Sequence, residues 1–151
     1  MYICREELDS PIAMAMIGAL DEELLERYPE PGANHFELEA EEIDAGGGAF
    51  LVGYVDGRPV ACGAVRLIGE AAAEIKRMYV RPDVRGRGFA RAVLTELERI
   101  ARQLGAQRLV LETGERQCEA LALYQRSGFA RIDRFGRYRD SPLSVCMAKE
   151  L

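Results

Sequence analysis

The sequence predicts one domain of the α/β class, built on a mixed α+β sheet with helices packed on its faces. Three observations support this fold. Seven segments have the composition of strands and four have the apolar spacing of helices. An Asp-Gly pair joins two of the strands as a hairpin, and a strand–helix–strand crossover follows later. A chain of 151 residues is long enough to bury one sizeable core.

The first third of the chain is expected to form a strand and two helices. Residues 2–8 alternate loosely between apolar and polar types, as a strand does. Ser10 followed by Pro11 is typical of a helix start, and an apolar stripe at three- and four-residue spacing follows. This helix is expected to end before Pro29. Residues 36–43 are expected to form a short second helix.

Strand and helix patterns follow one another through the rest of the chain. Asp56 and Gly57 separate two apolar runs, which predicts a hairpin. An amphipathic pattern over residues 89–104 predicts a long helix, with Gly105 at its C-terminal end. A last helix is expected over residues 119–126. The expected strands are residues 49–55, 59–68, 74–80, 108–111, 129–135 and 143–148.

Composition narrows the class of partner. The formal net charge is −5 and no basic stripe stands out, so we expect no nucleic-acid partner. No apolar run reaches the 18 residues of a membrane span and no leader pattern opens the chain, so we expect no membrane partner and a cytoplasmic protein. The four cysteines are far apart and are expected to be reduced. His35 is the only histidine, so we expect no zinc or other metal site.

Residues 85–90, Arg-Gly-Arg-Gly-Phe-Ala, are the most informative segment of the sequence. They follow a strand and open a helix, where several backbone N–H groups have no helical acceptor. Gly86 and Gly88 let the backbone approach a ligand closely, and the helix dipole favours an anion there. Arg85 and Arg87 add positive charge. The segment therefore predicts a site for a phosphate or pyrophosphate group.

Two common phosphate-binding designs do not fit this segment. A nucleotide-triphosphate loop needs Gly-Lys followed by Ser or Thr, which the sequence lacks. A dinucleotide loop needs a third glycine where Arg91 stands, and its glycines follow the strand directly. Here five residues separate Val80 from Gly86. Glu112 does lie at about the spacing of a ribose-binding acid, but it does not outweigh these two differences.

A third design fits better. The pattern [RQ]-x-x-G-x-[GA] is satisfied by Arg85, Gly88 and Ala90, after a strand that ends in Met-Tyr-Val-Arg-Pro. A helix, a strand and the run Ala-Leu-Ala-Leu-Tyr-Gln-Arg-Ser-Gly-Phe of residues 120–129 follow. Over residues 74–132 the chain resembles the GNAT superfamily of N-acetyltransferases. The resemblance implies a mostly antiparallel, twisted sheet of about seven strands with helices on both faces.

The resemblance also implies how acetyl-CoA, the acyl donor, is bound. The glycine loop holds the pyrophosphate through backbone N–H groups, and the preceding strand pairs with the pantetheine arm. Tyr124 corresponds to a family tyrosine that donates a proton or hydrogen bond to the leaving thiolate. Gln117 stands where many relatives have an asparagine that contacts the arm. The implied donor-binding residues are Met78, Tyr79, Val80, Arg85, Gly86, Arg87, Gly88, Phe89, Ala90, Arg91, Gln117 and Tyr124.

A general base is needed because an alkyl ammonium, with a pKa of about 10.4, must lose a proton before it attacks. In relatives a carboxylate on the strand before the loop often takes it, and Glu74 is the matching residue. Glu112, on the next strand, is the alternative. Either carboxylate could instead pair with Lys76 or Arg77. His35 is expected to be exposed or structural.

The function expected by resemblance is an acetyl-CoA-dependent N-acetyltransferase in which the amine attacks the thioester directly. The acceptor is expected to be a small molecule such as an amino acid rather than a protein. Arg134, Arg137 and Arg139 lie among aromatic residues and could receive a carboxylate-bearing acceptor, although a solvated hairpin tip is the simpler interpretation. The alternative function is a non-catalytic sensor or interaction module that binds acetyl-CoA or coenzyme A. Relatives are often dimers, so a homodimer is possible.

Overall fold

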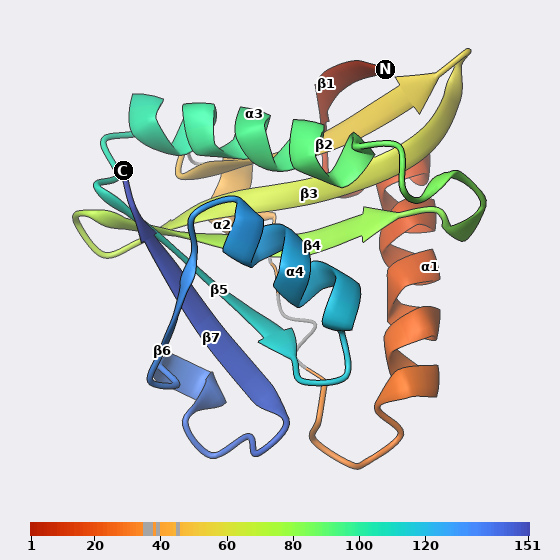
Figure 1. The fold of residues 1–151 in the computed structure, drawn as a ribbon. Coiled ribbons are helices and arrows are strands. Elements are labelled where there is room, and N and C mark those ends of the chain that lie inside the picture. The colour runs from red at the N-terminus through yellow and green to blue at the C-terminus, as the bar shows by residue number, and fades with distance from the viewer. Residues whose placement is uncertain (35–37, 39, 45) are drawn as a thin grey trace.

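The structure, a computed structural model, describes every residue except 35–37, 39 and 45. A twisted sheet of seven strands forms its centre, in the order β1-β2-β3-β4-β5-β7-β6 (Figure 1). All neighbouring strands are antiparallel except β4 and β5, which are parallel. The strands are β1 (Tyr2–Glu6), β2 (Gly48–Val55), β3 (Arg58–Ile68), β4 (Ala72–Val80), β5 (Arg108–Gly114), β6 (Ala130–Ile132) and β7 (Ser144–Glu150).

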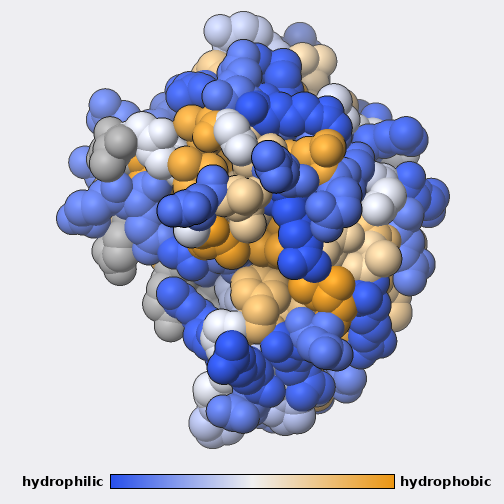
Figure 2. Space-filling view, turned by 90° about the vertical axis from the view of Figure 1, so that its left-hand side faces the viewer, coloured by the Kyte–Doolittle hydropathy of each residue, from blue (hydrophilic) through white to orange (hydrophobic). Residues whose placement is uncertain are grey.

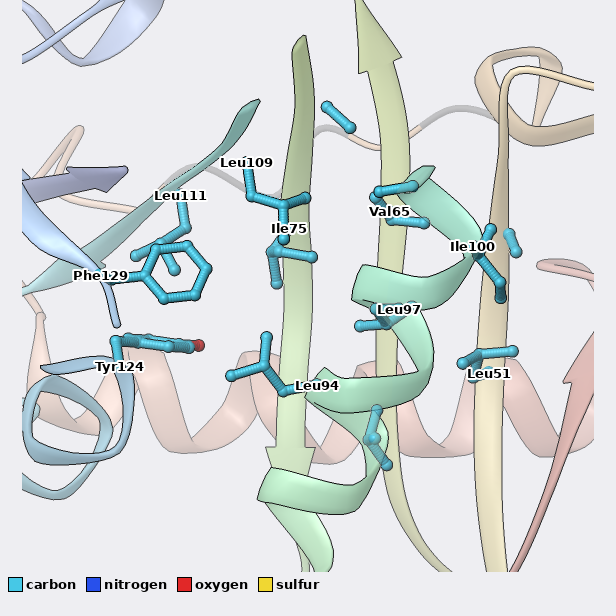
Figure 3. Packing of buried hydrophobic residues seen from close by; sticks show 14 of the residues in the cluster. Leu51, Val65, Ile75, Leu94, Leu97, Ile100, Leu109, Leu111, Tyr124 and Phe129 are labelled. Atoms are coloured by element: carbon cyan, nitrogen blue, oxygen red, sulfur yellow. The ribbon is translucent and has the colours of Figure 1, made fainter. Parts of the chain in front are cut away.

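Helices cover both faces of this sheet. The helices are α1 (Pro11–Arg27), α2 (Glu41–Asp44), α3 (Phe89–Gln103) and α4 (Cys118–Arg126), with short 3-10 turns η1 (Pro82–Val84) and η2 (Gly136–Tyr138). Residues of α3 and α4 belong to one buried cluster, and residues of α1 and α2 belong to another. Figure 3 shows α3 and α4 in front of the sheet and α1 behind it. No described helix has the length and apolar character that crossing a membrane requires.

The larger core lies between the sheet and the pair α3 and α4. Leu94, Leu97 and Ile100 form the buried stripe of α3 and point onto β2, β3 and β4 (Figure 3). Tyr124 of α4 packs edge-on against Phe129, with 5.7 Å between ring centroids. This packing attaches α4 to the sheet beside β5, which positions one wall of the site.

Local signals predicted most of the elements. The Ser10 side chain accepts a hydrogen bond from the Ala13 N–H at 3.1 Å, which confirms the expected start of α1. The expected hairpin is confirmed, and both turn residues have positive φ, 51° at Asp56 and 78° at Gly57. The second helix is much shorter than expected, because only Glu41–Asp44 is helical. Residues 38 and 40 are not helical, and 36, 37 and 39 lie outside the described residues.

The two parallel strands separate halfway along their length. Pairing runs from Ala72 opposite Arg108 to Ile75 opposite Leu111, but β4 continues to Val80 and β5 to Gly114. Beyond Ile75, β4 is irregular, since the β3–β4 register shifts between Cys62 and Ala64. Arg77, at this shift, has a φ of 58°, which is rare for a residue with a side chain. The sheet therefore opens between β4 and β5.

Figure 2 shows the side of the molecule that carries the C-terminus, the end of α3 and the β3–β4 turn. Its surface is mainly hydrophilic, with a group of apolar residues near the centre. Partly buried apolar residues of these segments are Leu67, Leu104 and Leu151. The homodimer expected from the sequence stays a prediction.

Candidate functional site

A pocket of about 110 Å³ passes through the sheet at the opening between β4 and β5. Its lining includes Ala120 and Tyr124 of α4 on one face and Leu20, Leu24 and Tyr28 of α1 and its C-terminal end on the other. Residues 75–78 of β4 and 112–114 of β5 line its sides. Because α1 and α4 cover opposite faces, a molecule at each end could meet the other inside the sheet.

One side of the pocket includes an open strand edge. The pairing of β4 with β5 ends at Ile75 and Leu111, so the edge at residues 78–80 has no strand partner on the β5 side within the described part of the chain. An open strand edge can bind an extended molecule that carries amide groups, because such a molecule pairs as an added strand. Met78, Tyr79 and Val80, the residues expected to hold the pantetheine arm, belong to this edge. Met78 also lines the pocket.

The glycine loop lies between the end of β4 and the start of α3. Gly86 and Gly88 have φ of 81° and 83°, and a Cβ on either would meet no described atom within 4 Å. Gly88 is the N-cap of α3, whose first intrahelical bond joins the Ala92 N–H to the Gly88 carbonyl at 3.1 Å. The preceding N–H groups at the helix start are therefore available to a phosphate.

The arginines of the loop differ in what they contact. Arg85 donates from Nε to the Val80 carbonyl at 2.8 Å and from Nη2 to Glu23 at 2.7 Å. Its guanidinium thus faces α1, whereas the sequence led us to expect a charge that faces the phosphate. Arg87 and Arg91 are exposed, and neither pairs with an acidic side chain among the residues that the structure describes. These two are the better candidates for charge contacts with phosphate.

Tyr124 contributes a phenol to the pocket. Its side chain is only 5% exposed, and Figure 3 shows its hydroxyl pointing from α4 toward β4. Burial, and then the nearby Glu112 carboxylate, raise the pKa of Tyr124 above that of a free phenol. The phenol therefore keeps its proton at neutral pH and can act as a hydrogen-bond donor.

Glu112 contributes a carboxylate with an unusual proton affinity. It is partly buried on β5, lines the pocket and accepts a hydrogen bond from the Ser144 hydroxyl at 3.0 Å. Burial raises the pKa of Glu112 to about 7, and the Glu74 carboxylate adds to this rise. The Ser144 hydrogen bond and the Lys76 charge oppose it. A carboxylate that titrates near neutral pH can take and release a proton under physiological conditions.

Glu74 lies on β4 but is not among the residues that line the pocket. Its side chain is fully buried, pairs with Arg66 at 2.8 Å and accepts a hydrogen bond from the Tyr138 hydroxyl at 2.6 Å. Arg66 also pairs with Glu42. Both carboxylate oxygens thus already accept hydrogen bonds from protein donors. Its role as a base stays a prediction.

The remaining predicted residues have varied surroundings. Gln117 lines the pocket at the N-cap of α4, and its side-chain oxygen accepts a hydrogen bond from Arg27 at 3.1 Å. Arg134 donates to backbone carbonyls of its own loop, at Ser144 and Pro142, both at 3.0 Å. Among the arginine-rich loop's aromatic residues, Tyr138 reaches the pocket. His35 lies outside the described residues.

Three residues near the site were not named as site residues from the sequence, although Tyr138 belongs to the arginine-rich loop considered for the acceptor. Tyr28 is buried against Gly114, where an added Cβ would lie 1.9 Å from the tyrosine oxygen, and accepts the Arg116 N–H at 2.8 Å. Tyr138 and Ser144 contact the two carboxylates described above. These residues are brought to the pocket by the β5–β7 register and by the path of the chain after α1. Their spacing in the sequence therefore does not identify them.

Comparison with known proteins is consistent with this geometry. The model of the acetyltransferase (GNAT) family matches residues 6–129. The chain is 37% identical to the IAA acetyltransferase of Azospirillum brasilense, over 99% of this chain and 97% of that protein. A candidate acyl-CoA N-acyltransferase from Klebsiella pneumoniae is 33% identical, with a TM-score of 0.81 over 99% and 97% of the two chains. A GNAT family acetyltransferase from Elizabethkingia anophelis with acetyl-CoA bound shares the fold, with a TM-score of 0.71 at 18% identity over 99% and 97%.

Proposed function

This chain belongs to the GNAT family of acetyltransferases, and we propose that it transfers an acetyl group from acetyl-CoA to a small primary amine in the pocket between β4 and β5. One observation carries the proposal. The pocket crosses the sheet, with a buried phenol on the α4 face and a carboxylate of raised pKa on β5.

The donor is proposed to bind along the open edge of β4 and the glycine loop. Support comes from the open strand edge at residues 78–80 and from the open space beside Gly86 and Gly88. Arg87 and Arg91 would add charge for phosphate groups. The solved relative from Elizabethkingia anophelis carries acetyl-CoA on the same fold. Together these features fit a long ligand with amides at one end and phosphates at the other.

The acceptor is proposed to enter from the α1 face. Leu24, Tyr28 and Leu143 line that side of the pocket. A small amine is proposed as the acceptor that enters this space. An amino acid remains within this class, because polar groups of Asn34 and Thr113 line the same pocket.

Glu112 is proposed as the general base in place of Glu74. Its pKa of about 7 lets it take a proton from the ammonium group and release it again at neutral pH. The neutral amine then attacks the thioester carbon, and a carbon–nitrogen bond forms. As the carbon–sulfur bond breaks, the nitrogen loses its second proton, which passes to the departing sulfur or to solvent. This direct attack needs no covalent enzyme intermediate. Cys118, which begins α4 and could be considered as a nucleophile, does not line the pocket.

Tyr124 is proposed to stabilise the departing thiolate. A thiol has a pKa of about 8.5, below that of this buried phenol. A full proton transfer from Tyr124 would therefore be unfavourable, and the phenol acts as a hydrogen-bond donor to the sulfur. A donor held in place before the reaction stabilises the charge as it develops.

The proposal is tested with acetyl-CoA and a panel of amino acids, polyamines and aryl alkyl amines. IAA is included in the panel because the Azospirillum relative is named for it. Release of free thiol and an acetylated product in the mass spectrum would support it. Glu112→Gln and Tyr124→Phe should each lower kcat, while the exposed controls Glu115→Gln and Tyr2→Phe should not. Tight coenzyme binding with no acetylated product from any acceptor would contradict the proposal and favour a non-catalytic binding module.

A further inference from the structure

The hydroxyl of Ser144 lies between the Glu112 carboxylate and a second serine. Its Oγ is 3.0 Å from Glu112 Oε1 and 2.9 Å from Ser141 Oγ. Ser144 is 3% exposed and Ser141 is 7% exposed, so water competes little for these bonds. A hydrogen bond from the Ser144 N–H to the Ser141 carbonyl, at 3.1 Å, fixes the turn that carries both.

Proton counting sets the direction of each bond in this row. A serine hydroxyl has one proton to donate and two lone pairs to accept with. When Glu112 is ionised it can only accept, so Ser144 donates to it and Ser141 donates to Ser144. When Glu112 is protonated, Glu112 can donate to Ser144, and Ser144 then donates to Ser141. The same three groups stay bonded in both states.

We propose that Ser144, oriented by Ser141, is a positioning residue that holds the Glu112 carboxylate toward the pocket before and after it takes the proton of the acceptor. The inference rests on the proposed role of Glu112 as the base. It assigns both serines, which lie at the start of β7 and just before it, to the acid–base cycle. The reversal moves protons only within existing hydrogen bonds and needs no further reactant.

Ser144 acts against an environment that otherwise disfavours the ionised form. Burial is the largest influence on Glu112, and the Glu74 carboxylate adds to it. A hydrogen bond to an ionised group is stronger than one to its neutral form, so the Ser144 bond favours the carboxylate. The charged and titratable groups that face Glu112 from the surrounding elements are Glu74 and Lys76 of β4, Cys146 of β7, Tyr124 of α4, Tyr138 of η2 and Tyr28 after α1.

A direct test follows the titration of Glu112 by NMR in protein labelled with ¹³C at the glutamate carboxyl carbons. The Glu112 signal is the one that Glu112→Gln removes. Ser144→Ala should move its midpoint upward by about one pH unit, because a charge-assisted hydrogen bond is lost. Ser144→Thr, which keeps the hydroxyl, should restore the midpoint. Ser141→Ala should give a smaller upward shift, and the matched control Ser127→Ala, at the end of α4, should give none.

A folded Ser144→Ala protein with an unchanged Glu112 midpoint would overturn the inference. If Ser144→Ala does not fold, Ser144→Cys replaces it, and the weaker donor should still raise the midpoint. This titration needs no acceptor, so it is independent of the proposed function. With an acceptor in hand, the acidic limb of kcat/KM should move with the midpoint in Ser144→Ala. A limb that stays while the midpoint moves would instead remove Glu112 from the base role.

Discussion

Arg85, the first residue of the glycine loop, donates from Nη2 to Glu23 of α1 at 2.7 Å. Its Nε also binds the Val80 carbonyl at 2.8 Å, and its guanidinium lies 5.7 Å from the centre of the Tyr79 ring. This contact thus links the loop that is proposed to hold the donor to α1, the helix that lines the acceptor side of the pocket. A substitution at Arg85 should therefore affect both donor binding and acceptor binding.

The first prediction separates the arginines of the loop. Arg87→Gln should weaken coenzyme A binding by up to about ten-fold and make it less sensitive to salt, because an exposed charge near phosphate is lost. Arg85→Gln should instead raise the KM of the acceptor, with a smaller effect on coenzyme affinity. Titration calorimetry at two salt concentrations and acceptor kinetics measure both. If Arg85→Gln lost more coenzyme affinity than Arg87→Gln, the assignment of Arg87 rather than Arg85 to the phosphate would be wrong.

The second prediction concerns the space beside the loop. Gly88→Val should abolish coenzyme binding, because its side chain would project into the open space proposed for the pyrophosphate. Gly105→Val is the matched control, at the other end of α3, with a φ of 87° and equally open surroundings. Both variants should lose similar stability from backbone strain, of about 1–2 kcal/mol. Normal coenzyme affinity in Gly88→Val would argue against the cradle.

The third prediction is a pH dependence of stability. The pKa of Glu112 is raised from 4.5 to about 7 by burial, so the fold favours the protonated acid. The protonated acid contributes its full stabilisation of the fold below about pH 4.5, and this stabilisation is lost as the pH rises through 7. Relative to the unsubstituted protein, the free energy of unfolding of Glu112→Gln should therefore be little changed at pH 4.5 and higher by about 3 kcal/mol at pH 8, from a pKa difference of roughly 2.5 units. Chemical denaturation of both proteins across this range measures the gain, and an equal gain at both pH values would refute it.

The fourth prediction concerns the contact that builds the acceptor wall. Gly114→Ala should destabilise the protein by about 1–3 kcal/mol, because its Cβ would overlap the Tyr28 ring. Gly18→Ala is the control, since no described atom lies within 4 Å of a Cβ there, in the middle of α1. It should add about 0.5–1 kcal/mol of stability. In a Tyr28→Ala background the Gly114→Ala cost should disappear, and a persisting cost would point to another cause.

Sequence predicted the elements whose cause is local. The Asp56-Gly57 turn and the apolar stripe of α3 depend on residues within a few positions of each other, so pattern alone located them. The glycine loop was found for the same reason. The second helix was overestimated, since only Glu41–Asp44 is helical and the described residues 38 and 40 are not. A helix this short is not held by propensity alone, so its bounds depend on packing that a sequence pattern does not report.

The roles of the carboxylates could not be predicted from the sequence. Glu74 is paired with Arg66 across the β3–β4 register, and Glu112 meets Ser144 across the β5–β7 register. Registers depend on irregularities such as the left-handed Arg77, which no local residue signals. The sequence therefore named two possible bases, and the proposal of Glu112 rests on their three-dimensional partners.

Donor and acceptor are proposed to meet at the opening between β4 and β5. A crystal structure of the protein with acetyl-CoA tests this most directly. We expect the thioester between Met78 and Glu112, with its sulfur beside Tyr124 and the pyrophosphate against residues 86–88. Density for the whole coenzyme in the surface groove lined by Arg91, Arg99 and Lys149, with the pocket between the strands empty, would contradict it.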